Sequence, residues 1–186
     1  MNLLVDKLPT EHEGLKINTN FRSFILFELL MQDNEIGKED KIALTLRLFY
    51  NEIPKDIKKA IEVILWFYSG GKDKEKINTK KSKQKKNKRI YSYEYDNSLI
   101  YSAFLDQYGV DLNEVDYLHW FKFKSMFEGL KSDNKICEIM GYRAIDINKI
   151  KNKDEKNRYK TLQREYALPD NRTEEEKEQE FAEAFW

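Results

Sequence analysis

Cysteine, histidine and proline are scarce in this sequence, and the first two scarcities exclude whole classes of protein. The single cysteine, Cys137, cannot form an internal disulfide and fits a reducing cytoplasm. The two histidines, His12 and His119, lie far apart, and neither has a second ligand at zinc spacing. No run approaches the roughly 20 apolar residues of a membrane span, and acidic residues such as Asp6 interrupt any apolar signal sequence. We therefore expect a protein without metal or cofactor that stays inside the cell that makes it.

Net charge is also absent, because 33 basic residues balance 33 acidic ones. A neutral chain lacks the overall field that draws a protein to nucleic acid or to an anionic membrane. The charges are unevenly distributed, however. Residues 72–89 hold ten basic and two acidic side chains with Ile77 as the single large apolar residue, and residues 171–186 are acidic. We predict that residues 72–89 form a mobile linker, because they cannot bury enough apolar surface to offset their backbone entropy.

Only seven glycines and three prolines accompany about 40% apolar residues, which indicates a helical protein. We predict an all-α fold with one compact domain over residues 1–170 and an acidic tail over 171–186, in which Thr173 caps a last helix. The domain begins with a short extended arm and contains a three-helix part (19–68), the basic linker, and a later helical part (96–167). The apolar spacing predicts helices over about 20–32, 40–50, 55–68, 96–108, 112–129, 133–141 and 147–167.

Residues with capping chemistry precede most of these helices. Pro54 is placed as the first-turn proline of the third helix. The last short helix is expected to end at Gly141. The cap residues that we predict are Asn20 or Thr19, Asp40, Asp96, and Ser132 or Asp133.

The stretch from 95 to 130 organises the chain, because it predicts two aromatic-rich helices joined by a short turn. Gly109 tolerates the positive φ that ends a helix. Asp111 and Glu114 then have the spacing of a capping box, which predicts that the second helix begins there.

The second of these helices carries more aromatic side chains than one face can hold. Successive helical positions turn by about 100°, so Trp120, Phe121 and Phe123 cannot all point inward. Trp120 and Phe123 differ by about 300° on this count. We therefore expect that one of these two rings belongs to the core and that the other faces a partner.

The sequence contains no arrangement that is typical of catalysis. Ser69-Gly70-Gly71 lacks the strand–loop–helix context and the Lys-Ser/Thr ending of a phosphate-binding loop. Cys137 either pairs with His119 or is a buried structural thiol, and the second is favoured because nothing near it in sequence activates it. We predict that the protein is not an enzyme.

The basic run allows two interpretations. Its lysines can neutralise phosphates, and the tyrosines that follow, Tyr91, Tyr93 and Tyr95, can stack on bases. Alternatively, the run is a solvated loop and the tyrosines begin the next packed element, which is favoured because lysines lack the planar fork of arginine. The candidate nucleic-acid-binding residues are Lys80, Lys81, Lys83, Lys85 and Lys86, with Lys88 and Arg89 beside them.

Four segments resemble one family, the bacteriophage gene-product-fifteen proteins of phages and prophages of Gram-positive bacteria. They read YSYEYD (91–96), LIYSAFLDQYGVDL (99–112), LHWFKFKSMFEGL (118–130) and ICEIMGYRAIDI (136–147). The Asn20-Phe21-Arg22 start of the first helix and the Tyr166-Ala167-Leu168-Pro169 ending also fit, so the resemblance runs over roughly residues 1–170. Its most specific parts are LHW and GYR.

The resemblance implies a protein of the phage tail module, encoded between the major tail protein and the tape measure protein. It implies a tail assembly chaperone in the cytoplasm of the bacterial host, with the tape measure and major tail proteins as partners and homo-oligomerisation left open. A tape measure is a long helix with an apolar stripe, which a groove would cover. Our candidates for that groove are Phe24, Trp120, Phe123 and Phe127, although no family motif assigns them this role. The alternatives are a nucleic-acid-binding accessory protein acting through residues 72–95 and a structural component of the virion tail.

Overall fold

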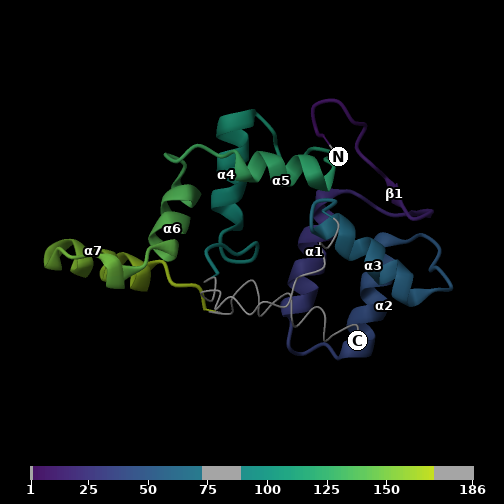
Figure 1. Cartoon of the computed structure of the whole chain (residues 1–186), viewed down its shortest axis with the longest axis horizontal. Coiled ribbons are helices and arrows are strands. Elements are labelled where there is room, and N and C mark those ends of the chain that lie inside the picture. Colours follow the sequence, from purple (N-terminus) through teal and green to yellow (C-terminus); the bar gives the residue numbers. More distant parts are fainter. Residues whose placement is uncertain (1, 73–88, 170–186) are drawn as a thin grey trace. The chain divides into compact units, whose positions relative to one another are not determined.

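The computed structural model describes residues 2–72 and 89–169, and these are mainly helical (Figure 1). This confirms the predicted all-α class and the short extended arm at the N-terminus. The predicted linker lies almost wholly outside the described residues, and the predicted tail helix from Thr173 entirely so. The elements are β1 (Glu11–His12), β2 (Leu15–Lys16), α1 (Phe21–Gln32), α2 (Lys38–Phe49), α3 (Ile57–Tyr68), α4 (Asn97–Tyr108), α5 (Trp120–Glu128), α6 (Lys135–Ala144), the 3-10 helix η1 (Ile147–Lys149) and α7 (Lys153–Glu165).

The described residues gather in two compact units. The first unit consists of residues 2–72 and 115–128, and the second of residues 89–114 and 129–169. The chain therefore leaves the first unit, builds part of the second, and returns to the first with α5. Our expectation of one domain over residues 1–170 stays a prediction.

The first unit begins with a two-stranded antiparallel hairpin in which Glu11 pairs with Lys16 and His12 with Leu15. The two turn residues, Glu13 and Gly14, both have positive φ. This is the geometry of the tight turns that match the twist of a hairpin. The hairpin leads directly into the cap of α1.

Capping side chains define the starts of α1 and α3. Asn20 accepts a hydrogen bond from the backbone N–H of Arg22, as predicted. The cap of α3 is Asp56, whose carboxylate accepts from the N–H of Lys59. The prediction that Pro54 lies in the first turn of α3 is therefore wrong, because the aspartate two residues later satisfies the free N–H groups.

The second helix begins earlier than its predicted cap. Gly37 occupies the cap position of α2 without a side-chain bond, and Asp40 lies inside the first turn. An acidic residue is favourable there because it faces the positive end of the helix dipole. The prediction of Asp40 as the cap is therefore wrong, because the cap is Gly37 and Asp40 lies within the first turn of the helix.

The helix expected from Asp111 onward begins only at Trp120. The Asp111 carboxylate accepts from the N–H groups of Asn113 and Glu114, so the predicted capping box closes a turn instead. Residues 118–120 are then held extended by an antiparallel bridge to the start of α1: the N–H of Phe21 donates to the carbonyl of Leu118 at 2.9 Å. This bridge is a long-range contact that local spacing does not reveal.

The second unit contains α4, α6, η1 and α7. Gly109 ends α4 in the left-handed conformation with φ of 62°, as predicted. Gly141 does not end α6, which continues to Ala144, and Asn134 occupies its cap position in place of Ser132 or Asp133. The stretch predicted as one helix over 147–167 is divided into η1 and α7. The second begins after Asn152, whose side chain caps α7 by accepting from the backbone N–H groups of Asp154 and Glu155.

Candidate functional site

Three of the four predicted groove residues are core residues of the first unit. Phe24 and Phe123 are fully buried and Trp120 is 2% exposed. Their rings lie in a row: Phe24 and Trp120 have centroids 4.9 Å apart, and Trp120 and Phe123 are 5.7 Å apart, both nearly parallel. Each aromatic contact of this kind adds to the free energy gained from burial. Their role in binding a partner stays a prediction, and these rings can reach a partner only if the core opens.

The expectation that only one of Trp120 and Phe123 belongs to the core is wrong, because both are buried. A turn of 300° is the same as 60° in the other direction, so residues three apart share one helix face. Phe121 is also buried, 3% exposed, because α5 packs against α1 on one side and α3 on the other. The three rings in the N-terminal half of α5 therefore all belong to the core.

Phe127 is the one predicted groove residue that reaches the surface. It is half-buried, and its ring lies parallel to that of Phe123 with centroids 6.4 Å apart. It thus continues the aromatic row towards the C-terminal end of α5. A partner can contact it without disturbing the core.

The LHW motif joins three segments of the first unit. The N–H of Trp120 donates to the carbonyl of Thr19 at 2.8 Å, beside the Leu118 bond described above. The indole N–H of Trp120 donates to the carbonyl of Tyr68 at 3.2 Å, at the C-terminal end of α3. The motif therefore fixes the N-terminal arm and α3 against α5.

His119 completes this junction as a neutral side chain. Its Nδ1 accepts from the N–H of Phe121, so Nε2 carries the proton and donates to the carbonyl of Pro9 at 2.8 Å. Burial lowers the pKa of His119, and the bond to Pro9 opposes that effect in part. Both ring nitrogens are thus used in holding the N-terminal arm, which leaves no lone pair for a metal ion.

Cys137 has the character of a structural thiol. It is half-buried in the second unit, and its Sγ lies 3.9 Å from the carbonyl of Leu130. Burial, with the nearby Asp133 charge, raises the pKa of the thiol, which disfavours the nucleophilic thiolate. Within the described ranges, no three His, Cys, Asp or Glu side chains gather in a way that holds a metal ion.

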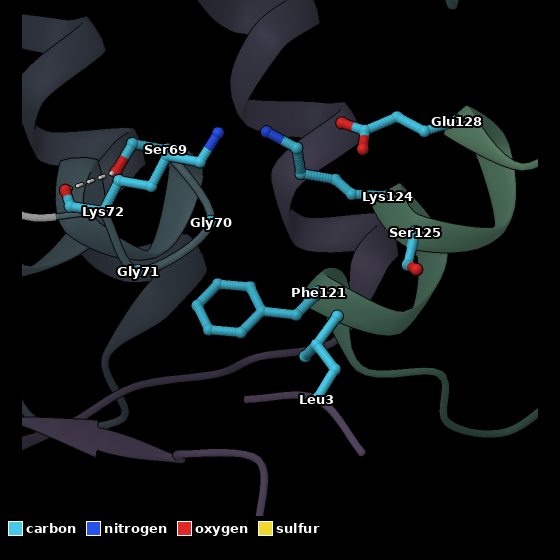
Figure 2. A pocket seen from close by; sticks show the side chains of 9 residues that line it. All are labelled: Leu3, Ser69, Gly70, Gly71, Lys72, Phe121, Lys124, Ser125 and Glu128. Carbon is cyan, nitrogen blue, oxygen red and sulfur yellow. Dashed lines mark hydrogen bonds between the residues drawn. The ribbon is translucent and has the colours of Figure 1, made fainter. Parts of the chain in front are cut away.

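A surface hollow lies beside α5 and the end of α3 (Figure 2). It has a volume of about 290 Å³, and the ring of Phe121 forms part of its lining. Figure 2 shows the side chains of Lys72 and Lys124 pointing towards one another across it, with the Glu128 carboxylate at its edge. The hollow therefore combines an aromatic wall with two cationic groups and one anionic group.

Lys124 is fixed at the edge of this hollow by the end of α3. Its ammonium group donates to the carbonyl of Tyr68 at 3.2 Å. It also lies over the rings of Trp120 and Tyr68, 5.7 and 6.0 Å from their centroids. A cation here satisfies a terminal carbonyl and complements the negative end of the helix dipole.

The N-terminal apolar turn, which we define as residues 2–6, forms the other side of the hollow through Leu3. Its backbone is closed by bonds between Asn2 and Asp6, including Asn2 N to the Asp6 carboxylate at 2.6 Å. This ordered turn presents three consecutive apolar side chains to solvent. Leu3, Leu4 and Val5 are 46%, 93% and 78% exposed.

The GYR motif organises the second unit through Arg143, which is 5% exposed. Its guanidinium forms two parallel bonds to the Asp96 carboxylate, at 2.6 and 3.0 Å. It also donates to the carbonyls of Ile90 at 3.0 Å and Tyr166 at 2.6 Å. One side chain thus joins the segments YSYEYD, GYR and YALP. Asp96 occupies the cap position of α4 as predicted, but its carboxylate serves this ion pair and makes no capping hydrogen bond, which corrects our expectation of a capping oxygen.

The segment that follows the basic run is packed. Arg89 is 3% exposed and donates to the carbonyl of Tyr91 and to the hydroxyl of Ser92. Tyr93 is buried, whereas Tyr95 is half exposed. The predicted nucleic-acid-binding lysines, Lys80 to Lys86, lie outside the described residues. Arg89 and Tyr93 therefore belong to the packed part of the second unit, whereas the interpretation of the lysines stays a prediction.

The motifs therefore build the cores of two helical units, and an exposed apolar turn lies beside a hollow of the first unit. The chain belongs to the Bacteriophage Gp15 protein family, whose model matches residues 4–168. No curated protein and no solved structure matches it significantly. None of the helices in residues 2–72 and 89–169 is long and apolar enough to cross a membrane. The family match includes all four motifs and ends before the acidic tail.

Proposed function

We propose that the chain is a tail assembly chaperone of a bacteriophage, which binds the tape measure protein and assists assembly of the tail tube. Membership of the Bacteriophage Gp15 family supports the phage part of this proposal. The single observation that supports binding is the N-terminal apolar turn beside the hollow, where three apolar side chains are exposed on an ordered backbone.

An apolar turn next to a hollow suits one face of a partner helix. A long amphipathic helix that is left alone exposes an apolar stripe and aggregates. Leu4 and Val5 provide apolar surface, and the wall formed by Phe121 offers a place for one protruding side chain of the helix. Such a contact follows the helix-in-groove mode of recognition, in which residues at i, i+3, i+4 and i+7 are the anchors.

This proposal moves the contact from the predicted aromatic row to the exposed turn. The buried rings of Phe24, Trp120 and Phe123 support the surface from below, and Phe127 lies at the end of their row. A chaperone must bind and later release its partner, so contacts with exposed side chains serve it better than contacts that require the core to open.

Co-expression of the chain with the tape measure protein of the same phage tests the function. The tape measure expressed alone is expected to aggregate, and the wild-type chain is expected to raise its soluble yield several-fold and to co-purify with it. Leu4→Asp should abolish co-purification while leaving the circular dichroism spectrum unchanged, because Leu4 is 93% exposed. Ile53→Asp is the matched control, since Ile53 is another exposed apolar residue in a loop of the same unit.

If the wild-type chain leaves the solubility of the tape measure unchanged, the chaperone function is refuted. If Leu4→Asp and Ile53→Asp both retain full activity, the function stands but the N-terminal apolar turn is not its binding surface.

A further inference from the structure

Helix α7 of the second unit carries four basic side chains in one row. They recur three or four positions apart, the spacing that places side chains on the same face of a helix. They are Lys153, Lys156, Lys160 and Arg164, and we call them the basic row. The row is about 16–17 Å long, because each residue advances a helix by about 1.5 Å. No residue of α7 is buried, so the row is accessible along its whole length.

This arrangement of charges is unfavourable for the helix itself. Like charges three or four positions apart repel one another and destabilise a helix, and the basic row contains three such pairs in succession. The acidic residues of α7 are Asp154, Glu155 and Glu165, and none of them lies three or four positions from a member of the row. In the part of the chain that the structure describes, no member of the row forms an ion pair. A local pattern that opposes the fold without compensation indicates a binding role.

Contacts with α6 hold α7 in place beside the row. The side-chain amide of Gln163 donates to the carbonyls of Tyr142 and Ile145, at 2.9 and 2.8 Å. The ring of Tyr159 packs on that of Tyr142, with centroids 6.4 Å apart. The backbone that carries the basic row is therefore fixed within the second unit.

The surroundings of the row restrict the kind of partner. Its exposed neighbours Asn157 and Thr161 are polar, whereas the apolar Leu162 is half-buried. The centre of a protein–protein interface is rich in apolar and aromatic contacts and poor in lysine. Nucleic acid needs no such contacts, because cations that neutralise phosphates supply most of its sequence-independent affinity. The row therefore fits a phosphate backbone better than the surface of another protein.

The row also fits a duplex better than a single strand. Proteins that bind single strands stack the unpaired bases on exposed aromatic rings. Tyr159 is the single aromatic residue of α7, and its ring is half-buried against Tyr142.

We propose that the basic row binds the phosphate backbone of double-stranded nucleic acid without reading its sequence. This binding goes beyond the chaperone function and does not depend on it, because it requires only α7 and its support in the second unit. It also differs in place from the predicted alternative, which assigned nucleic-acid binding to residues 72–95.

Four phosphate contacts give weak binding with a defined salt dependence. Each neutralised phosphate contributes about −0.9 to the slope of log affinity against log salt concentration, so four contribute about −3.6. Binding should therefore be about 50-fold tighter at about 50 mM salt than at about 150 mM. We expect a Kd on the order of 100 µM at the higher concentration, which is the weak end of non-specific binding.

Fluorescence anisotropy of the full chain with a labelled DNA duplex of about 20 base pairs tests the proposal. The row variant replaces all four members of the basic row with glutamine and should lower the magnitude of the slope by about 3.6. A control variant changes the net charge equally at four exposed positions of the first unit and should keep the wild-type slope. Its substitutions are Lys16→Gln, Arg47→Gln, Lys55→Gln and Lys122→Gln. Equal slopes in the wild type and the row variant would overturn the proposal.

Two further arms separate other sources of binding. A linker variant, with Lys80, Lys81, Lys83, Lys85 and Lys86 replaced by glutamine, should still bind the duplex through the basic row. Loss of all binding in the linker variant would overturn the proposal in favour of residues 72–95. A labelled polyglutamate peptide should bind the wild type more weakly than the duplex does, and equal or tighter binding would overturn the proposal in favour of an acidic protein partner.

Thermal unfolding distinguishes a binding role of the row from a structural one. The row variant should unfold at the wild-type temperature or above it, because it removes three like-charge contacts. A lower unfolding temperature would show that the row stabilises α7 and would overturn the proposal. The row variant should also co-purify with the tape measure protein as the wild type does, so failure of the chaperone function and failure of nucleic-acid binding are separate outcomes.

Discussion

Each of the two units of this protein is stabilised internally by a different kind of interaction. The first unit has a row of stacked aromatic rings, from Phe24 through Trp120 to Phe123. The second unit depends on a buried ion pair between Arg143 and Asp96. Burial of rings stabilises in proportion to the apolar area removed from water. A buried ion pair recovers little more than its own desolvation cost, but it requires one geometry.

This difference predicts which amino-acid substitutions each unit tolerates. A ring can be replaced by another apolar side chain of similar volume at modest cost. The guanidinium of Arg143 bonds to three other residues, and lysine cannot reproduce its planar fork. The two most specific motifs of the sequence, LHW and GYR, thus mark two cores of opposite character.

The largest expected effect is the loss of the central ring of the first unit. Trp120→Ala removes a side chain that is 2% exposed, together with its bond to the Tyr68 carbonyl. Truncating a buried Trp costs about 3–5 kcal/mol, and we expect a value near 5 kcal/mol, which a marginally stable unit does not survive. Urea unfolding measured by far-ultraviolet circular dichroism checks this. Trp120→Phe is the control and should retain the fold.

Breaking the ion pair of the second unit should cost slightly less. Arg143→Ala leaves the Asp96 carboxylate buried without its partner, which costs about 3 kcal/mol or more. Arg143→Lys should recover only part of this, because an ammonium group cannot reproduce the planar fork that bonds to all three residues. Circular dichroism measures this loss because it reports on both units. The described tryptophans, Trp66 and Trp120, lie in the first unit and do not report on the second. A variant that matches the wild type by circular dichroism would show that the ion pair is dispensable.

Two glycines, one in each unit, allow the comparison to be tested with smaller changes in the free energy of unfolding. Gly71 and Gly109 have similar φ values, 73° and 62°, so any side chain is strained at both. A Cβ at Gly71 would meet the Phe121 ring at 3.2 Å, whereas nothing lies within 4 Å of one at Gly109. We expect Gly109→Ala to cost about 1 kcal/mol and Gly71→Ala about 2 kcal/mol. Thermal unfolding of both variants measures the difference, and equal costs would contradict the tight packing around the hollow.

The smallest effect concerns pH and the first unit. Burial lowers the folded-state pKa of His119 below its ordinary value of 6.5. The unfolded chain therefore binds a proton at higher pH than the folded chain does, and stability rises with pH. The stabilising contribution is complete above about pH 6.5 and is lost as the pH falls towards the folded-state pKa. Urea midpoints at pH 7.5 and 5 should show this decrease. His119→Gln keeps a donor for Pro9 but does not titrate, so its midpoint should depend less on pH.

Local patterns predicted those parts of the fold that local forces determine. The Asn20 cap, the Gly109 ending and the extended arm follow from the preferences of single residues and short spacings. The start of α5 does not follow, because the Leu118 carbonyl bonds to Phe21, far away in sequence. The role of Asp96 was missed for the same reason, since its partner Arg143 lies on another helix.

The candidate site was predicted less well than the fold. Aromatic richness identified α5 as central, but it did not distinguish a core from a groove. The exposed side chains of Leu3, Leu4 and Val5 appear in the sequence as an ordinary apolar start. Only the bonds that close the turn reveal that these residues are ordered and uncovered.

The return of α5 to the first unit has a consequence for synthesis of the protein. Helices α1 to α3 are complete once Tyr68 has been made, but the ring that completes their core is in α5. The ribosome must add the 60 residues from 69 to 128 first, which takes about 3–12 s at about 5–20 residues per second. During that interval the nascent chain exposes Phe24 and Phe67, which α5 later covers. Host folding factors therefore have a defined window in which to act, and slower translation of this stretch should lengthen it.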